Sequence, residues 1–470
     1  MKTTQESRTS HPGGWTRRNF LKAGAATAFT AASWDRVLGA NERVGVGVIG
    51  FGLMGRIHTR SLLAQSDAQV VAVAETFRPR LEAAAQLAGG NVAQCADFRR
   101  LLENKAVDAV VVATPDHWHA LMTMMACAAG KDVYVEKPLT LFVREGRWMV
   151  DAARRHKRVV QIGTQQRSAP HYQRARELVR GSAIGEIVSV QVNFFRNVSP
   201  GFGRPPDQEV PVDLDWNLWL GPAPYRSYNP NRGLYHFRWF WDYSGGQMTN
   251  LGQHSLDIVH WITNVAGPNA VTSAGGRFFL KDNGEVPDVQ DAILEYPGFQ
   301  VVCQYRECAA GATDPNRSGV QFFGTKGSLM LGRDGFELVP DKKEKPVNIV
   351  ARIMGGHPVG GPQPEPANVE PQFWTEPLKD TSANRTNQPL LHVRNFLDCV
   401  KSRKEPVSDL ESSHGTVTAC HLANISLRTG RKLRWDAQRE EIIGDPEAAR
   451  MLERPYRAPW DAELRAVRGI

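Results

Sequence analysis

The sequence lacks several features that would assign it to a class of protein at once. Its 470 residues contain no apolar run of the ~20 residues that a helix needs to cross a bilayer, so we expect no stable membrane span. The six cysteines show neither a CxxC pair nor a Cys/His zinc spacing, and buried free thiols are the better expectation. The chain has no internal repeat and no block of about five or six basic residues, so nucleic acid is not an expected partner.

What the chain does contain is the composition of an ordinary globular protein. Hydrophobic residues make up 41% of it and charged residues 23%, which is typical of folded domains in water. A length of 470 residues is long for one domain and comfortable for two, with enough chain to bury two cores.

Residues 1–40 are typical of an export signal rather than of a folded domain. Arg17-Arg18 lies in a twin-arginine motif, a weakly apolar stretch follows, and small residues near Ala40 offer a cleavage site. A basic amphipathic start to an ordinary domain is the alternative. This segment has six Lys/Arg and two Asp/Glu, so it holds about half of the net charge of +8. Because twin-arginine export carries folded proteins, we expect a periplasmic protein that loads any cofactor in the cytoplasm and meets the export machinery already folded.

A glycine-rich turn follows the first apolar strand. The segment VGVIGFGLMG leads into Gly50-x-Gly52-x-x-Gly55. In a dinucleotide-binding fold these glycines allow a tight turn, close approach of the backbone to a pyrophosphate, and packing of helix on strand. Such turns are common on their own, but a second apolar strand, 69–74, ends at Glu75, where an acid would bind the ribose 2′-hydroxyl.

Glu75 also predicts which dinucleotide binds. Its carboxylate favours a free 2′-hydroxyl and repels a 2′-phosphate, so NAD is the expected cofactor. The chain would load this nucleotide in the cytoplasm, before its export. Arg78 and Arg80 lie just beyond and could instead accept the phosphate, which keeps NADP possible.

Strands and helices alternate through residues 42–164, which we assign to the first domain. Expected strands are 44–49, 69–74, 107–113, 132–135 and 158–162, with helices after Leu53 and at 80–87, 119–129 and 143–156. This alternation predicts an α/β domain of the Rossmann type, a doubly wound parallel sheet.

The pattern changes in residues 165–435, the expected second domain. Strands are predicted at 187–195, 271–279, 290–296, 299–308 and 318–331, and helices at 171–180, 390–402 and 412–429. This indicates an α+β domain with one mostly antiparallel, open sheet. A Gly/Pro-rich stretch, Gly355–Pro371, predicts a long loop or lid, and residues 436–470 are taken as a C-terminal tail.

Chemically useful residues follow two of the buried strands. Pro115 and His119 come after one strand, and Glu136-Lys137 ends the next. Ligands of such folds bind at the carboxyl ends of the strands, where a partly desolvated lysine could donate to a substrate oxygen and stabilise developing alkoxide charge. The alternative for Lys137 is a surface lysine in a turn before proline.

Together these motifs resemble the Gfo/Idh/MocA family, named for glucose–fructose oxidoreductase and inositol dehydrogenase. Three later motifs, GTQQR (163–167), WFWDYSGG (239–246) and GQHSLD (252–257), look like its exported bacterial branch. The resemblance covers about residues 43–445. It implies NAD(P)-linked oxidation or reduction of a hydroxyl on a sugar or cyclitol. It also implies a second domain whose open sheet forms the interface of a homo-oligomer, a dimer or a tetramer.

The resemblance also assigns residues to roles. Lys137 matches the family's active-site lysine and His254 its catalytic histidine, and Pro115, His119 and Glu136 match positions around the nicotinamide. A base that takes a hydroxyl proton should titrate near neutral pH, which suits histidine. Without the resemblance, a satisfied structural histidine would be the expected role of His254.

One position departs from the family pattern. The family usually has an aspartate four residues before the histidine, and this chain has Asn250. Asparagine can orient a ring or a hydroxyl, but it carries no charge that would raise the pKa of His254. On a helix Asn250, His254 and Asp257 share one face, so Asp257 or the nearby Asp242 could take over the proton relay.

Substrate contacts are predicted in the aromatic segment 216–243, whose rings and polar groups suit a carbohydrate. An irregular segment packed by its own aromatics is the equally good alternative. Arg167, Arg238, Tyr243 and Asp257 are the candidate substrate-binding residues. His117-x-His119 has no third ligand in view, so we predict no metal site.

Three hypotheses of function remain open. The first is an exported NAD-dependent oxidoreductase that acts on a sugar or polyol. The second is a lyase or glycoside-cleaving enzyme, in which a tightly bound NAD is reduced and restored within one cycle. The third is a catalytically silent sugar-binding protein, which the presence of both Lys137 and His254 argues against.

Overall fold

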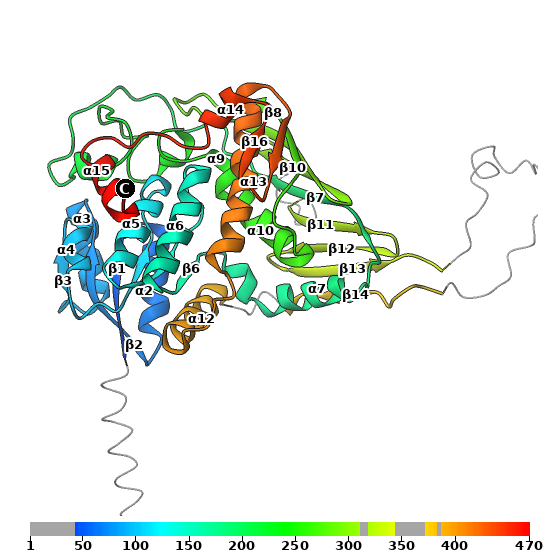
Figure 1. Ribbon diagram of the computed structural model, residues 1–470, viewed down its shortest axis with the longest axis horizontal. Coiled ribbons are helices and arrows are strands. Elements are labelled where there is room, and N and C mark those ends of the chain that lie inside the picture. Colours follow the sequence, from blue (N-terminus) through cyan, green and yellow to red (C-terminus); the bar gives the residue numbers. More distant parts are fainter. Residues whose placement is uncertain (1–42, 311–317, 344–371, 383–386) are drawn as a thin grey trace, which may run out of the picture.

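The computed structural model describes residues 43–310, 318–343, 372–382 and 387–470. The expected signal, 1–40, and the expected lid, Gly355–Pro371, lie outside these residues. No described helix is long and apolar enough to cross a membrane. Two domains lie side by side, each built around its own sheet (Figure 1).

The first domain is the predicted doubly wound parallel sheet. Its strands are β1 (Val44–Ile49), β2 (Ala68–Ala74), β3 (Ala93–Cys95), β4 (Ala109–Val112), β5 (Asp132–Val135) and β6 (Val160–Ile162). Its helices are α2 (Leu53–Leu63), α3 (Arg78–Leu87), α4 (Phe98–Leu102), α5 (Asp116–Ala128) and α6 (Val143–His156). The strand order is β3-β2-β1-β4-β5-β6, with every pair parallel. The order reverses between β1 and β4, which places a ligand crevice at their carboxyl ends.

The second domain has one large sheet of ten strands. The strands are β7 (Ile187–Phe195), β8 (Ala270–Gly276), β9 (Val289–Tyr296), β10 (Phe299–Arg306), β11 (Gly319–Gly324), β12 (Gly327–Gly332), β13 (Gly335–Pro340), β14 (Leu378–Asp380), β15 (Leu433–Asp436) and β16 (Glu441–Ile443). Their order is β14-β13-β12-β11-β7-β10-β9-β8-β15-β16. Among the described strands of this sheet only β7 and β10 pair in parallel, so the predicted fold class is confirmed in both domains.

The remaining helices belong to the second part of the chain. They are η1 (Gln165–Ser168), α7 (Pro170–Arg180), α8 (Trp216–Leu220), η2 (His236–Trp239), α9 (Gly246–Asn250), α10 (Gly252–Thr263), α12 (Gln388–Ser402), α13 (Leu410–Thr429), α14 (Pro446–Arg450) and α15 (Trp460–Arg468). The long α13 stands between the two domains and contacts α6 of the first and α10 of the second (Figure 1).

One strand prediction is wrong. Residues 318–331, expected as a single strand, form the hairpin of β11 and β12, which Thr325 and Lys326 connect. The strand expected at 271–279 ends at Gly276. Residues 436–470, taken as a tail, contain β16, α14 and α15, and Trp460 and Leu464 of α15 are buried against the first domain.

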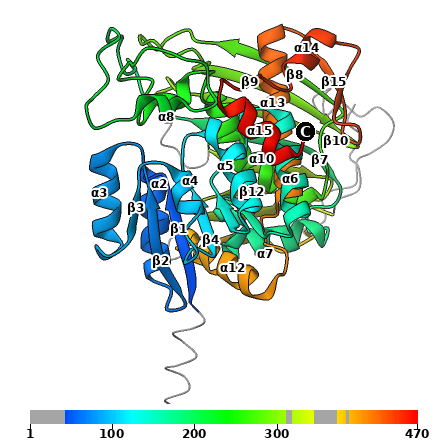
Figure 2. The ribbon, with the colours of Figure 1, turned by 60° about the vertical axis from the view of Figure 1, so that its left-hand side comes forward.

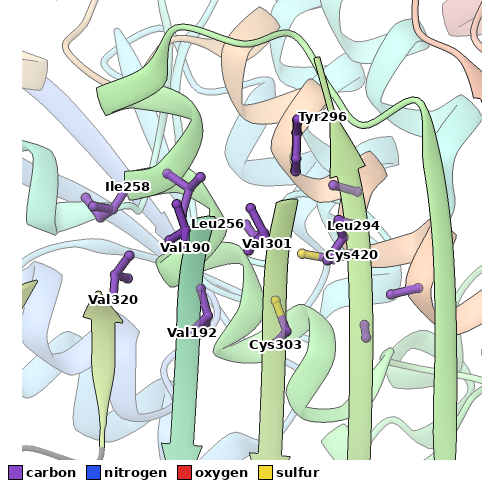
Figure 3. Packing of buried hydrophobic residues seen from close by; sticks show 14 of the residues in the cluster. Val190, Val192, Leu256, Ile258, Leu294, Tyr296, Val301, Cys303, Val320 and Cys420 are labelled. Atoms are coloured by element: carbon purple, nitrogen blue, oxygen red, sulfur yellow. The ribbon is translucent and has the colours of Figure 1, made fainter. Parts of the chain in front are cut away.

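The core of the second domain lies between its sheet and the helices. Val190 and Val301 from the sheet face Leu256 of α10, and Cys303 and Cys420 lie among the same apolar side chains (Figure 3). All six cysteines are free thiols, four of them buried and two half-buried. The other face of the sheet is open: along β9, Ile293 is 43% exposed whereas its neighbours Ala292 and Leu294 are buried.

Candidate active site

The glycine turn has the shape that a dinucleotide phosphate requires. Gly50 has a φ of +87°, and a Cβ there would lie 2.6 Å from the carbonyl oxygen of Ala113. A Cβ on Gly55 would lie 2.1 Å from the carbonyl oxygen of Gly50, so only glycine lets α2 pack this closely on β1. A Cβ on Gly52 would meet nothing within 4 Å. The open side of the turn therefore lies at Gly52, in front of the N-terminus of α2, where a pyrophosphate would bind.

Glu75 is held at the edge of this turn. Its Oε2 accepts a hydrogen bond from the amide of Phe51 at 2.9 Å, and its Oε1 accepts from the amides of Thr76 at 2.8 Å and Phe77 at 3.1 Å. Of the two nearby arginines, Arg78 is paired with Asp213 and Arg80 lines the cleft. The carboxylate is thus fixed where it can accept from a ribose hydroxyl.

A cleft runs from the glycine turn to the second domain. Seven of the predicted site residues line it: Gly50, Gly52, Glu75, Pro115, Glu136, Lys137 and Arg238. The opposite wall comes from the second domain, with Trp219, Leu234, Tyr235 and Phe237. The irregular segment that carries α8 arches over the first domain (Figure 2), and Trp219 of α8 is among the residues that line the cleft.

Glu136 and His119 support the turn that carries Lys137. Glu136 is buried, and its Oε1 lies 2.6 Å from Nε2 of His58 and accepts from Gln165 at 2.9 Å. Burial alone would raise the pKa of Glu136, but the contact with His58 and the charge of Lys137 outweigh it and lower this pKa. The two ring nitrogens of His119 face the carbonyl oxygens of Pro138 at 2.6 Å and Thr114 at 2.9 Å.

Lys137 points from this turn to the second domain. Its Nζ donates to the backbone oxygen and to Oδ1 of Asn250, both at 2.9 Å. Burial is the main cause that lowers the pKa of Lys137 to about 8, against the opposing charge of Glu136. An ammonium has three donors, so one N–H is left after the two bonds to Asn250.

His254 follows Asn250 by four residues but lines a different cavity. This second cavity, of about 460 Å³, is also lined by Gln166, Asn193 and Arg333. Burial, and then the charges of Lys137 and Arg333, lower the pKa of His254 well below its usual 6.5. The imidazole is therefore neutral at neutral pH, but it is a weaker base than the histidine titrating near neutral pH that the sequence predicted.

Three residues that line this second cavity each have a buried polar atom without a hydrogen-bond partner among the described residues. The three atoms are Oε1 of Gln166, Oδ1 of Asn193 and Nδ1 of His254. An unpartnered buried polar atom is costly and indicates a missing partner, such as a water or a ligand. Neither Gln166 nor Asn193 was predicted as a site residue, although Gln166 lies within the GTQQR motif.

Arg167 and Asp257 are paired with each other and line neither the cleft nor the second cavity. Two hydrogen bonds of 2.8 and 2.6 Å join the guanidinium to the carboxylate, and the two residues are 1% and 0% exposed. The pair fastens η1 to α10. The structure thus does not bring these two predicted substrate contacts to either site.

Tyr243 is likewise buried in the aromatic cluster of the second domain. Its ring lies 5.0 Å from Trp219 and 5.2 Å from His117, and most rings of the segment pack against one another. Of the aromatic segment, Tyr225 and Tyr235 are more than half exposed, and Tyr235 lines the cleft. Packing within the segment is therefore its main role.

Asp116 is a cleft residue that the sequence analysis left without a role. It opens α5, lines the cleft beside Lys137, and accepts a hydrogen bond from Ser244 at 2.5 Å. Burial raises its pKa. Within the described ranges no three His, Cys, Asp or Glu residues gather as a metal site would require.

Comparison with known proteins agrees with this geometry. A family model described as "Oxidoreductase family, NAD-binding Rossmann fold" matches residues 44–164. A second, described as "Oxidoreductase family, C-terminal alpha/beta domain", matches residues 192–274 and 373–462.

Two curated relatives and one solved structure illustrate the similarity. The scyllo-inositol 2-dehydrogenase (NAD(+)) of Bacillus subtilis is 22% identical over 85% of this chain and 98% of its own length. The inositol 2-dehydrogenase 1 of Saccharopolyspora erythraea is 38% identical, but over only 31% of this chain and 44% of its own length. A levoglucosan dehydrogenase, solved with NADH and levoglucosan, superposes with a TM-score of 0.60 at 16% identity, over 83% of this chain and 99% of that one. Because both domains match models of one family, and the cleft has the glycine turn, the acid and the lysine that its motifs predict, the chain belongs to the Gfo/Idh/MocA family of oxidoreductases and has an NAD-binding Rossmann domain.

Proposed function

We propose that this protein oxidises or reduces a hydroxyl-bearing carbon of a sugar, glycoside or polyol by hydride transfer with NAD. The cofactor would lie in the cleft from Gly52 past Glu75 to Lys137, and the substrate would extend into the second cavity. Asn250 ends α9 and His254 lies in the first turn of α10, so they do not share the face of one helix that the sequence predicted. Lys137 binds Asn250 and its charge acts on His254, so the lysine at the end of the cleft and the histidine of the cavity can act on one substrate.

The observation that carries this proposal is the set of unpartnered atoms at the second cavity. Two of the three, on Gln166 and Asn193, are amide oxygens, which only accept hydrogen bonds. A polyhydroxylated ligand offers several O–H donors at the spacing of a small ring, and it would satisfy these acceptors. The named relatives, which act on inositols or levoglucosan by their names, support the same substrate class.

The proposed chemistry divides two tasks between two side chains. In the oxidation direction, the neutral imidazole of His254 takes the hydroxyl proton, and the ammonium of Lys137 donates a hydrogen bond to the oxygen as negative charge develops on it. NAD, which the glycine turn at Gly50–Gly55 and the carboxylate of Glu75 would hold, would supply the acceptor for the hydride that leaves the same carbon. The products are a carbonyl compound and NADH, with the proton left on the histidine.

The test is an assay of NAD reduction with a panel of inositols, levoglucosan and free hexoses. We expect turnover with at least one of them, and we expect His254→Ala to lower kcat by about 10²- to 10⁴-fold. His156→Ala, at the end of α6 and outside both cavities, is the matched control.

The same preparation separates the alternatives. Stoichiometric NAD released on denaturation, with no reduction of added NAD by any substrate, would contradict simple oxidation and favour the closed cycle of a lyase. A protein that binds these sugars without any hydride transfer would be a silent binding protein.

We further propose export by the twin-arginine pathway and assembly into a homo-oligomer. Arg17-Arg18 supports the first, and the open face of the sheet, with Ile293 and Val339 exposed, supports the second. Replacing both arginines by lysine should keep the protein in the cytoplasm. Light scattering of the purified protein should give the mass of a dimer or a tetramer.

A further inference from the structure

Hydrogen bonds continue from Lys137 into the second domain beyond Asn250. Oδ1 of Asn250 accepts from Lys137 at 2.9 Å, and Nδ2 of Asn250 donates to Oε1 of Gln247 at 3.1 Å. Asn250 is 3 residues after Gln247, so both amides project from the short helix α9. The side chain of Asn250, the residue that departs from the family pattern, therefore makes one hydrogen bond to Lys137 and one to Gln247.

This series of hydrogen bonds, from Lys137 through Asn250 to Gln247, ends at a buried carboxylate. Nε2 of Gln247 donates to Oε1 of Glu307 at 2.8 Å, and Nε1 of Trp239 donates to Oε2 of Glu307 at 2.5 Å. Glu307 follows β10, is 1% exposed, and also pairs with Arg196. This acid thus lies three hydrogen bonds from Lys137.

The two ends of the series fix the orientation of both amides. An ammonium can only donate, so Asn250 must present its oxygen to Lys137 and its N–H to Gln247. A carboxylate can only accept, so Gln247 must present its N–H to Glu307 and its oxygen to Asn250. Turning either amide over would place two donors or two acceptors face to face. Both ends therefore demand the same arrangement.

We propose that Gln247 and Glu307 are positioning residues, which hold the side-chain oxygen of Asn250 on the ammonium of Lys137 and so set the direction of its remaining N–H. In this chain a distant carboxylate orients the partner of Lys137 through two amides, whereas an aspartate at position 250 would contact the ammonium directly. Amides pass on orientation and polarisation here, and no proton moves along them. The catalytic meaning of the arrangement rests on the proposed function, but its geometry does not.

The test reads Lys137 directly and needs no substrate. The full-length protein is labelled briefly with acetic anhydride across pH 6–11, and mass spectrometry follows acetylation of Lys137, which requires the free amine. Releasing the orientation of Asn250 weakens the acceptor that its side-chain oxygen offers to the ammonium, which disfavours the charged form of Lys137 and lowers its pKa. We therefore expect Gln247→Met and Glu307→Gln to move the labelling midpoint of Lys137 to lower pH by about half a unit to one unit. Asn250→Ala should move it at least as far.

The control is Gln290→Met. Gln290 is a buried glutamine whose amide donates to Ser273 and Asn424, away from the cleft. Charged groups that act on Lys137, namely Glu136, Asp116, Arg238 and Arg333, are unchanged in all these variants. A change in the labelling midpoint of Lys137 therefore reports the hydrogen bonds that run from Lys137 to Glu307.

The outcomes separate this inference from the proposed function. If Asn250→Ala moves the midpoint whereas the folded Gln247→Met and Glu307→Gln variants stay with wild type and Gln290→Met, the positioning role is wrong, whatever the enzyme does. If the midpoints move as expected but no sugar or polyol reduces NAD, the geometry stands and the proposed function fails. With a substrate in hand, a lower kcat at unchanged KM for NAD in Gln247→Met further supports the role.

Discussion

The ammonium of Lys137 and the side-chain oxygen of Asn250 lie 2.9 Å apart, and this contact joins the nucleotide domain to the second domain. The partner is a neutral amide, which stabilises the ammonium less than a carboxylate would. The lowered pKa of Lys137, about 8, is consistent with a buried ammonium that lacks a direct acidic partner at position 250.

Lys137→Ala should lower kcat by about 10²- to 10³-fold with little effect on NAD affinity, because the lost donor acts on the substrate oxygen. Steady-state kinetics and NAD titration measure the two effects. Lys131→Ala is the matched control. This lysine lies just before β5, the strand that leads to Lys137, and it donates to the carbonyls of Asn104 and Val107 outside the cleft. Turnover of Lys137→Ala within a few-fold of wild type would refute the role of the lysine.

Asn250→Asp should shift the alkaline limb of the pH profile to higher pH. The ammonium form of Lys137 is needed, and with a pKa of about 8 it is lost as pH rises through 8. A carboxylate at position 250 favours the charged form and should raise this pKa by about 1 unit or more. The logarithm of kcat against pH, for the variant and wild type, measures the shift. An unmoved or lowered alkaline limb would contradict the assignment.

Glu75→Ser should weaken the binding of NAD and strengthen the binding of NADP. The carboxylate is held by three backbone amides and is available to the ribose hydroxyls, so its loss should raise KM for NAD by about 10-fold or more. The same change removes the charge that repels a 2′-phosphate. Glu82→Ser, on the exposed side of α3, should leave both constants unchanged. Equal use of both cofactors by wild type would overturn the prediction.

Asp257→Asn should destabilise the fold rather than act on substrate affinity alone. It leaves the guanidinium of Arg167 buried with a weaker partner, and breaking a buried ion pair costs about 3–5 kcal/mol. Chemical denaturation measures the loss. Glu103→Gln breaks the exposed pair with Arg100 and should change stability by no more than about 0.5 kcal/mol. Similar stabilities of the two variants would show that the pair is not structural.

Stability should fall as pH drops below about 6.5. Burial lowers the pKa of His117 and His260 to about 3 and of His392 and His421 to about 4. Between these values and 6.5 the unfolded chain binds protons that the folded protein does not, so the free energy of unfolding decreases as pH falls. Each of the four contributes up to about 1.4 kcal/mol per pH unit. Denaturation at pH 7 and pH 5 measures the difference, and equal values would contradict it.

The sequence was sufficient where function depends on the ends of parallel strands. Gly50, Gly52, Glu75 and Lys137 all follow apolar strands, and parallel strands bring their carboxyl ends to one edge of a sheet. The structure places all four in one cleft. A sequence pattern predicts such a site because residues that follow successive parallel strands also lie next to one another in the fold.

Pairing between distant segments was not predictable in the same way. Arg167 and Asp257 are 90 residues apart, and nothing in either motif shows that each satisfies the other. Gln247 and Glu307 belong to no recognisable pattern, since their role depends on how α9 packs beside the end of β10. The hairpin of β11 and β12 was predictable in part, because Gly324 and Gly327 flank its turn. The apolar residues on both sides of these glycines instead favoured the interpretation as one strand.

The crossing of α12 and α15 back to the first domain has a consequence for synthesis on the ribosome. Val393 and Phe396 of α12 pack into one of the cores of that domain, and Trp460 and Leu464 of α15 into another. When residue 164 has been added, neither core is yet closed, and a nascent chain released at that point would expose apolar surface. The cores of the nucleotide domain are therefore closed only after α12 and α15 have been synthesised, so a fragment ending near residue 164 should be insoluble.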